Sequence, residues 1–109
     1  MSGITTHILD TVLGKPAAGV GVRLEIFDDD SWMLLAESAT DSDGRCRNLC
    51  SDVPAGLYRL TFSTGEYFRE QGRSSIYPEV CINFECQAEG RYHLPLLLSD
   101  NSYTTYRGS

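Results

Sequence analysis

The sequence of 109 residues predicts an all-β sandwich that contains one short helix. Apolar residues recur mostly at every second position, which is the period of a strand rather than of a helix. Turn-forming residues separate these runs at spacings typical of a β-sandwich. A single segment carries the start and stop signals of a helix. We expect residues 1–109 to form one domain, because a chain of this length needs only one core.

Six strands are expected in chain order, and the first two form a hairpin-like pair around the acidic turn at residues 28–30. Their alternating residues are Val22, Leu24 and Ile26; Trp32, Leu34 and Ala36; Tyr58, Leu60 and Phe62; Val80, Ile82, Phe84 and Cys86; Tyr92, Leu94, Leu96 and Leu98; and Tyr103, Thr105 and Arg107. Turn signals separate them at residues 14–16, 41–44 and 54–56 and at Gly90. Pro95 lacks a backbone donor, so its strand is expected at a sheet edge or paired only on its other side.

The helix is expected near residues 64–71. Ser63 and Glu66 have the S-x-x-E spacing of a capping box, and Gly72 follows about two turns later as a stop signal. A serine side chain at this position caps free backbone N–H groups of the first turn, which explains why the pattern predicts a helix start.

Composition excludes several function classes. Hydrophobic residues make up 41% and charged residues 22%, which is typical of a globular protein rather than a disordered one. The net charge of −6 is opposite to the basic surface that nucleic acids or anionic membranes attract. Neither a secretory leader nor a membrane span is recognisable, so we expect a cytoplasmic protein. A peroxisomal location stays open, although the terminal Arg-Gly-Ser is not the usual address.

The four cysteines lack a metal-site pattern. Cys46 and Cys50 are four residues apart, and Cys81 and Cys86 are five apart, unlike the C-x-x-C pairs of common zinc sites. Cys81 and Cys86 should also face opposite ways on one strand. We therefore expect free or buried thiols and no metal ion.

Two histidines and one arginine are the candidate catalytic residues. His7 and His93 both lie in extended apolar segments, and His93 should project from the sheet face opposite the core. Each histidine also fits a merely structural role, and an outer face becomes a site only where something covers it. Arg45 follows the turn Asp43-Gly44 and should begin a strand, although a solvated arginine is equally compatible with that position.

The carboxyl terminus adds further polar groups. Tyr106, Arg107 and Ser109 bring a phenol, a guanidinium, a hydroxyl and the terminal carboxylate together within four residues. Chain ends are often frayed, but the alternation up to Arg107 predicts a strand that could hold the end in place. No G-x-S-x-G elbow, phosphate-binding glycine loop or H-E-x-x-H zinc pair is present in the sequence.

Three long segments resemble the 5-hydroxyisourate hydrolase family, which is related to transthyretin. They are TTHILDTVLGKPAAGVGV at residues 5–22, TDSDGR at 40–45 and YHLPLLLSDNSYTTYRGS at 92–109. GLYRLTFSTGEYF at 56–68 and YPEVCINF at 77–84 follow in the order expected for the family. The terminal YRGS is the family's hallmark, and the hormone-carrying transthyretins lack it. The sequence departs from the pattern at residues 76–77 and 99–102, which affects loops only.

The resemblance implies a transthyretin-like sandwich of two four-stranded sheets with one short helix, assembled as a homotetramer around a central channel. It implies hydrolysis of a ring amide of 5-hydroxyisourate, giving 2-oxo-4-hydroxy-4-carboxy-5-ureidoimidazoline in urate degradation without a cofactor. The residues that fall on the family's catalytic positions are His7, Arg45 and His93, and those expected to bind substrate are Tyr106, Ser109 and Arg45. By strand alternation Arg107 points away from Tyr106, so we expect it to anchor the terminus.

Two other functions remain open from the sequence. The first is a carrier of the transthyretin type, which would bind a small aromatic ligand in the same channel. The second is an interaction protein whose sheet edges recruit partners. The two histidines, Arg45 and the terminal YRGS argue against the carrier, because a hormone channel does not need groups that transfer protons. The interaction protein predicts no catalysis and no dependence on the histidines.

Overall fold

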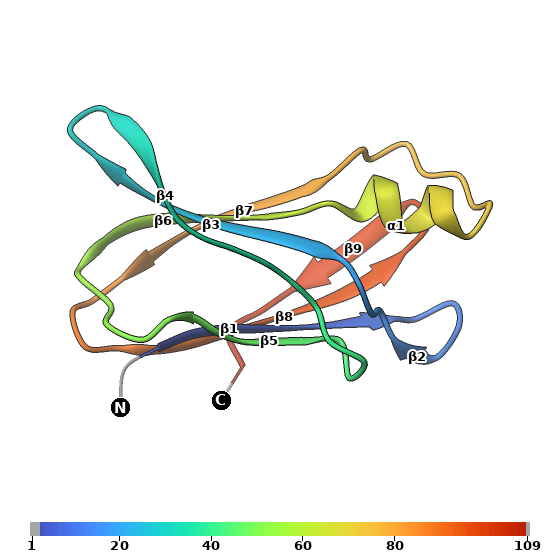
Figure 1. Ribbon diagram of the computed structural model, residues 1–109, viewed down its shortest axis with the longest axis horizontal. Coiled ribbons are helices and arrows are strands. Elements are labelled where there is room, and N and C mark those ends of the chain that lie inside the picture. Colours follow the sequence, from blue (N-terminus) through green and yellow to red (C-terminus); the bar gives the residue numbers. More distant parts are fainter. Residues whose placement is uncertain (1–2, 109) are drawn as a thin grey trace.

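Two β-sheets packed face to face make up the protein (Figure 1). The computed structural model describes residues 3–108. The first sheet contains β1 (Gly3–Asp10), β2 (Lys15–Pro16), β5 (Arg45–Cys50), β8 (Arg91–Ser99) and β9 (Ser102–Thr105). The second sheet contains β3 (Gly21–Asp28), β4 (Ser31–Ala39), β6 (Gly56–Phe62) and β7 (Val80–Cys86). Helix α1 (Thr64–Glu70) follows β6, so the predicted all-β sandwich with a short helix is confirmed.

The first sheet has the width of four strands although five contribute to it. β2 and β5 share one edge of β1, because β2 pairs at Leu9 and Asp10 whereas β5 pairs between Ile4 and His7. β1 and β8 run parallel, and β9 pairs antiparallel with β8. The second sheet is antiparallel in the order β4-β3-β6-β7. Segments from both ends of the chain therefore lie side by side in the first sheet.

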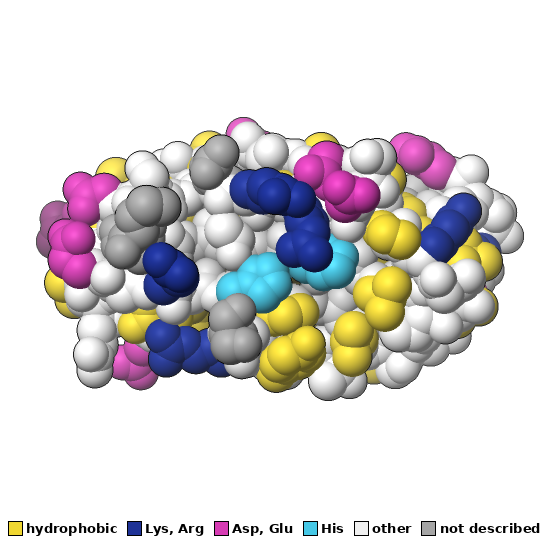
Figure 2. Space-filling view, turned by 90° about the horizontal axis from the view of Figure 1, so that it is seen from below, with side chains coloured by type: hydrophobic (Ala, Val, Ile, Leu, Met, Phe, Trp, Pro, Cys, Tyr) yellow, Lys and Arg dark blue, Asp and Glu magenta, His cyan; other side chains and the backbone are white. Residues whose placement is uncertain are grey.

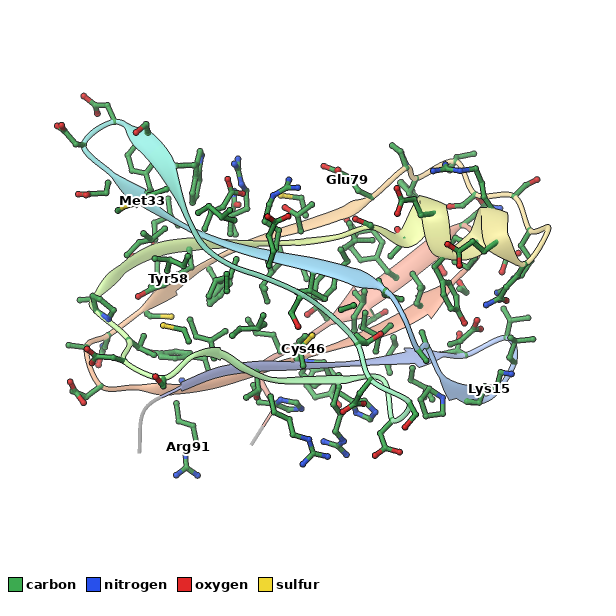
Figure 3. All side chains as sticks on the ribbon, in the orientation of Figure 1. Lys15, Met33, Cys46, Tyr58, Glu79 and Arg91 are labelled. Atoms are coloured by element: carbon green, nitrogen blue, oxygen red, sulfur yellow. The ribbon has the colours of Figure 1, made fainter. Side chains whose placement is uncertain are left out.

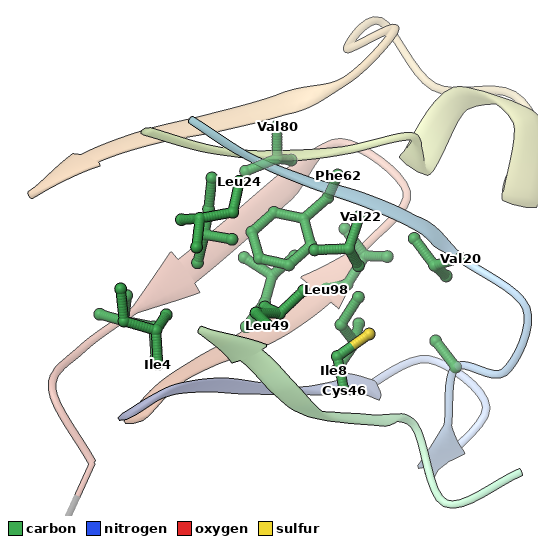
Figure 4. Close-up of a cluster of buried hydrophobic side chains, with 14 of the residues drawn as sticks. Ile4, Ile8, Val20, Val22, Leu24, Cys46, Leu49, Phe62, Val80 and Leu98 are labelled. Atoms are coloured by element: carbon green, nitrogen blue, oxygen red, sulfur yellow. The ribbon is translucent and has the colours of Figure 1, made fainter. Parts of the chain in front are cut away.

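The core lies between the sheets (Figure 4). Ile4 and Ile8 of the first sheet face Leu24 and Phe62 of the second, and all four side chains are fully buried. Cys46 of β5 also points into this space (Figure 3). Burial of one such large apolar side chain stabilises the fold by roughly 1.5–3 kcal/mol. Since alternate residues fill the core, the residues between them occupy the outer face of the first sheet.

The sequence predicted β1 only as an extended segment around His7. Its apolar alternation is weak, because half of its inward-facing residues are polar. These inward residues are Ile4, Thr6, Ile8 and Asp10. Thr6 Oγ1 donates a 2.6 Å hydrogen bond to the carbonyl oxygen of Leu94 on β8. Buried polar groups need such partners from other elements, and the partners are not evident from the local sequence. A search for apolar alternation therefore underestimates this strand.

A β-bulge divides the apolar stripe that was predicted for β4. Leu24 pairs with Ala36, whereas the next residue, Glu25, pairs with Leu34. Leu35 is therefore the extra residue, and the side chains on its two sides face opposite sheet surfaces. β4 is also an edge strand, where a bulge hinders pairing with another chain.

For the strand that contains Pro95, the sequence left open a sheet edge or pairing only on the other side. β8 is interior to the first sheet and pairs with β1 along its length. Pairing only on the other side is what the structure shows. The pairing of β8 with β9 stops at Leu96↔Thr105 and resumes only as a bridge between His93 and Gly108. Pro95 lies in this gap and has no N–H to donate. β9 accordingly ends at Thr105 and not at Arg107 as predicted.

Helix α1 lies where the sequence places it, but its first turn lacks the expected cap. Ser63 is the N-cap residue, and its side chain makes no capping hydrogen bond. Gly72 follows with a φ of 67°, in the left-handed region where glycine is favoured. The helix is instead held by its contacts, because Tyr67 donates a 2.8 Å hydrogen bond from its hydroxyl to Asp10 of β1.

All four cysteines are free thiols. Cys46 and Cys86 are buried and Cys81 is exposed, which confirms that the two side chains on β7 face opposite ways. Burial raises the pKa of the Cys86 thiol to about 11, so this thiol stays protonated at neutral pH. Within residues 3–108 no helix has the length and apolar character needed to cross a membrane.

Candidate active site

Four neighbouring segments of the first sheet bring the predicted site residues onto its outer face. Across one row, Arg45 of β5 pairs with His7 of β1, and His7 pairs with Pro95 of β8. In the adjacent row, Thr5 of β1 pairs with His93 of β8. Because alternate residues of a strand share a face, His7 and His93 emerge on the same surface one row apart. Figure 2 shows the two histidine side chains next to each other, with basic side chains beside them.

The carboxyl-terminal segment completes the second row. Gly108 forms a bridge with His93, in which the Gly108 N–H donates a 2.7 Å hydrogen bond to the carbonyl oxygen of His93. Tyr106, two residues earlier, lies on the same side and is 53% exposed. Gly108 is thus placed by pairing with β8, although β9 itself ends at Thr105.

An open pocket of about 370 Å³ lies over these rows. Its lining residues are His7, Leu9, Arg45, His93, Pro95, Leu97, Tyr106 and Gly108. We call the polar members His7, Arg45, His93 and Tyr106 the histidine face. All three candidate catalytic residues and two of the three candidate substrate-binding residues, Arg45 and Tyr106, therefore meet at one pocket. Ser109, the other candidate, lies outside the described residues, and so does the terminal carboxylate.

His93 is held by a hydrogen bond from its own sheet. Thr5 Oγ1 lies 2.8 Å from His93 Nδ1, and the direction of this bond depends on the tautomer of the ring. The hydrogen bond occupies Nδ1 and thereby orients the ring, since only Nε2 then remains for a ligand. Control of the second ring nitrogen by the partner of the first is common where histidine acts in catalysis.

Arg45 gives the histidine face a positive charge. Arg45 forms no ion pair within residues 3–108. Burial lowers the pKa of His93, and the nearby charges of Arg45 and His7 lower that pKa further. His93 is consequently neutral at neutral pH and has a lone pair available to accept a proton.

Gly108 lies against the ring of His93 because it has no side chain. A Cβ at this position would lie 2.7 Å from His93 Cδ2 and 3.2 Å from Pro95 Cγ. Real carbon atoms do not approach so closely, so a larger residue would displace either the tail or the imidazole. The close packing against His93 and Pro95 therefore explains why this position of the terminal motif is a glycine.

Arg107 points to the other side of the tail, as strand alternation predicted. Its guanidinium carbon lies 4.4 Å from the centroid of the Tyr92 ring, and Nη2 donates a 3.0 Å hydrogen bond to the carbonyl oxygen of Arg91. Both contacts join the tail to β8, so they fit an anchoring role. Arg107 does not line the pocket of the histidine face.

Sequence reasoning missed the part played by Thr5, Gly108 and the apolar residues Leu9 and Leu97. Thr5 is two positions before His7, so alternation would have placed both on one face. Its contact with His93 could not be found, because it depends on the parallel pairing of two strands 88 residues apart. Leu9 follows the same alternation, whereas Gly108 was noticed only as part of a motif.

The residues of this arrangement have the chemistry needed for acid–base catalysis. Within residues 3–108 no group of three or more His, Cys, Asp or Glu side chains could hold a metal ion. Two imidazoles can accept and return protons near neutral pH, and a guanidinium can stabilise an oxyanion. The apolar rim offers a surface for a planar ring.

Comparisons with known proteins place these observations in context. A family model described as the HIUase/Transthyretin family matches residues 4–108. The chain is 46% identical to a mouse 5-hydroxyisourate hydrolase, with 99% of this chain and 96% of that protein covered. The structure of a Klebsiella pneumoniae 5-hydroxyisourate hydrolase superposes with a TM-score of 0.90 at 39% identity, with both chains fully covered. Transthyretin from Sparus aurata gives a TM-score of 0.94 at 34% identity, covering 99% and 97% of the two chains.

Proposed function

The chain belongs to the HIUase/Transthyretin family, and we propose that it hydrolyses 5-hydroxyisourate at the histidine face. The observation that carries this proposal is the convergence of His7, Arg45 and His93 on one pocket. In the reaction, water adds to the amide carbonyl of the six-membered ring and the carbon–nitrogen bond breaks. The new carboxyl group and the released nitrogen remain in 2-oxo-4-hydroxy-4-carboxy-5-ureidoimidazoline, a product of urate degradation.

The two histidines handle the protons of this reaction. One imidazole takes a proton from the attacking water, and a proton is returned to the nitrogen that leaves the carbonyl carbon. The neutral state of His93 suits the first task, and His7 is one row away on the same face. General acid–base assistance of this kind contributes about 100- to 10,000-fold in rate.

Arg45 stabilises the negative charge of the reaction. Its guanidinium carries a permanent positive charge and lies in the same row as His7. Since it has no ion pair within the described chain, its charge is available for the substrate and for the oxyanion that forms at the carbonyl. Tyr106 supplies a hydroxyl at the pocket wall, and Ser109 is proposed to extend that wall.

A homotetramer would close the pocket. The histidine face lies on the outer surface of a sheet, and Tyr106 is half exposed there. The turn after β1 also exposes apolar side chains, with Val12 at 61% and Leu13 at 46%. A second subunit on this surface would exclude water and strengthen the electrostatic interactions of the site. Light scattering or gel filtration of the purified protein measures the assembly directly.

A ligand carrier is the alternative that the fold alone leaves open. The transthyretin of Sparus aurata superposes as well as the hydrolase of Klebsiella pneumoniae does, so backbone similarity does not distinguish the two functions. The paired imidazoles beside an unpaired arginine favour catalysis, because a carrier has no use for proton transfer.

One experiment separates these functions. Freshly generated 5-hydroxyisourate is mixed with the purified protein, and the decay of its ultraviolet absorbance is compared with the spontaneous decay. A hydrolase accelerates the decay in proportion to protein concentration and turns over many equivalents. A carrier alters the spectrum by no more than one equivalent per site, and an interaction protein leaves the decay unchanged. Either of the last two results would remove the proposed function.

A further inference from the structure

Resting on the proposed function, we propose that Thr5 is a positioning residue that accepts a hydrogen bond from the Nδ1–H of His93 and so directs the Nε2 lone pair into the pocket. Thr5 does not line the pocket itself. It therefore acts through His93 and not on the substrate.

The position of Thr5 is fixed by the sheet. Thr5 and His93 are direct partners in the parallel pairing of β1 and β8, and their polar atoms are 2.8 Å apart. A β-branched side chain in a strand has few accessible rotamers, so the hydroxyl is presented with little loss of entropy. Its neighbour Thr6 faces the core and donates to Leu94, which holds the same stretch of β1 against β8.

The tail holds the opposite edge of the ring. Gly108 lies so close to Cδ2 of His93 that a Cβ would be 2.7 Å away. With Thr5 at Nδ1 and Gly108 at Cδ2, both ring atoms next to Cγ are in contact. The ring edge formed by Cε1 and Nε2 is the part that remains directed away from these contacts. His93 thus has one ring orientation in which Nε2 serves the pocket.

The tautomer follows from the chemistry that the pocket requires. A neutral imidazole carries one N–H and one lone pair, and a general base must present the lone pair to the attacking water. Burial and the charges of Arg45 and His7 lower the pKa of His93 and keep it neutral. With the hydrogen on Nδ1 and accepted by Thr5 Oγ1, the lone pair lies on Nε2. The threonine O–H remains free to rotate toward water, because Thr5 is only half-buried.

The first test needs no variant. Long-range ¹H–¹⁵N correlation spectra of the ¹⁵N-labelled protein at neutral pH distinguish a protonated ring nitrogen from an unprotonated one. The chain contains two histidines, so the spectrum of His7→Gln assigns the remaining signals to His93. We expect protonated Nδ1 and unprotonated Nε2 in His93. The reverse tautomer in the folded protein overturns the inference.

The second test removes the hydroxyl. Thr5→Val keeps the branched shape, whereas Thr5→Ser keeps the hydrogen bond, and Thr61→Val on β6 of the second sheet is the matched control. Loss of a single hydrogen bond predicts a fall in kcat/KM of roughly tenfold for Thr5→Val, mainly in kcat, with a mixture of tautomers in His93. Thr5→Ser should stay within about twofold of the parent, since it restores the acceptor. The acidic limb of the pH–rate profile should move in Thr5→Val and not in Thr61→Val.

The outcomes separate the two proposals. If the parent protein does not accelerate the decay of 5-hydroxyisourate, the proposed function fails whatever the tautomer is. If the parent is active but Thr5→Val keeps the tautomer, the pH profile and the rate of the parent, the positioning role of Thr5 fails alone. Should Thr5→Val not fold, the tautomer of His93 in the parent protein still decides the question.

Discussion

Two groups of charged side chains on the first sheet use similar residues in opposite ways. The first, which we call the Asp10 cluster, consists of Asp10, Tyr67, Arg73 and Asp100. Asp10 is fully buried and accepts hydrogen bonds from Tyr67, Arg73 and two backbone N–H groups. Arg73 also pairs with Asp100 in the turn between β8 and β9. The other group is the histidine face, whose arginine has no ion pair within the described residues.

The difference shows what each group is available to do. In the Asp10 cluster every charge already has an opposite charge, so the cluster joins β1, α1 and the β8–β9 turn but offers little to a ligand. In the histidine face, Arg45 has no ion pair within residues 3–108, which leaves its guanidinium available to a substrate.

The largest expected effect is on catalysis by the histidine face. His7→Ala, His93→Ala and Arg45→Ala should each lower kcat/KM by about 100- to 10,000-fold, because each removes a proton carrier or the charge that stabilises the oxyanion. The same variants should keep their assembly and change the free energy of unfolding by less than about 1 kcal/mol. Absorbance assays and urea titrations measure the two quantities. A variant with a near-normal rate would remove that residue from the mechanism.

For the Asp10 cluster we expect a loss of stability with little loss of activity. Arg73→Met leaves the buried Asp10 carboxylate without its cation and should lower the free energy of unfolding by about 3–5 kcal/mol. Arg69→Ala on the exposed side of α1 is the matched control and should change it by less than about 0.5 kcal/mol. The double variant Asp10→Asn with Arg73→Met should recover part of the loss, because no unpaired charge remains.

Activity distinguishes the two groups further. At temperatures where Arg73→Met is folded, its kcat should stay within a few-fold of the parent, since Arg73 does not line the pocket. A folded Arg73→Met protein with collapsed turnover would contradict the separation of structural and catalytic charges.

The Asp10 cluster and the histidine face should affect the free energy of unfolding over different pH ranges. Burial by itself raises the pKa of Asp10, but the hydrogen bonds from Arg73, Leu13 and Tyr67 and the charge of Arg73 lower it below the usual 3.8. Its stabilisation is therefore complete above that value and is lost as the pH falls through the folded pKa. The pKa of His93 is lowered from 6.5 by burial, Arg45 and His7. As the pH falls below 6.5, the unfolded chain binds this proton first and stability decreases.

Urea titrations from pH 8 to pH 3 resolve these windows. The parent should lose stability in two stages, and His93→Gln should lack the contribution of His93 to the stage near pH 6. A His93→Gln protein with the same slope as the parent between pH 7 and pH 5 would show that His93 titrates normally.

The smallest expected effect is at Arg107. Arg107→Ala removes the contact with Tyr92 and the hydrogen bond to Arg91, which together hold the tail on β8. An exposed cation–π contact is worth roughly 0.5–1 kcal/mol, so stability or assembly should weaken modestly. In the correctly assembled protein the chemical step should be affected less. Normal stability together with collapsed turnover would assign Arg107 to the histidine face instead.

Much of the fold was accessible from alternation alone. Runs such as Tyr58, Leu60 and Phe62 are buried as predicted, because a strand with one apolar face needs only its own sequence to indicate burial. β1 was less visible because its inward Thr6 and Asp10 depend on partners from β8 and from Arg73. The sequence left open whether the strand of Pro95 lies at a sheet edge or pairs only on its other side, and the fold selects the second, since Pro95 interrupts only one of the two pairings of β8.

Local sequence patterns indicated the residues of the candidate site one by one, and only the family resemblance grouped them before the fold was known. The sequence placed His93 on an outer face and Arg45 at the start of a strand, and both positions are observed. It could not indicate that β1 lies between β5 and β8, so neither the pairing of His7 with Arg45 nor the contact of Thr5 with His93 was derivable.

The sequence by itself determined the all-β class, the short helix, the outward direction of His93 and the residues able to move protons. Those properties depend on alternation and on side-chain chemistry, which are local. The tertiary structure alone decided that strands from both ends of the chain lie side by side, with Gly108 against the ring of His93. Such pairings join residues far apart in the chain, and they are selected by the burial of the whole core instead of by any one segment.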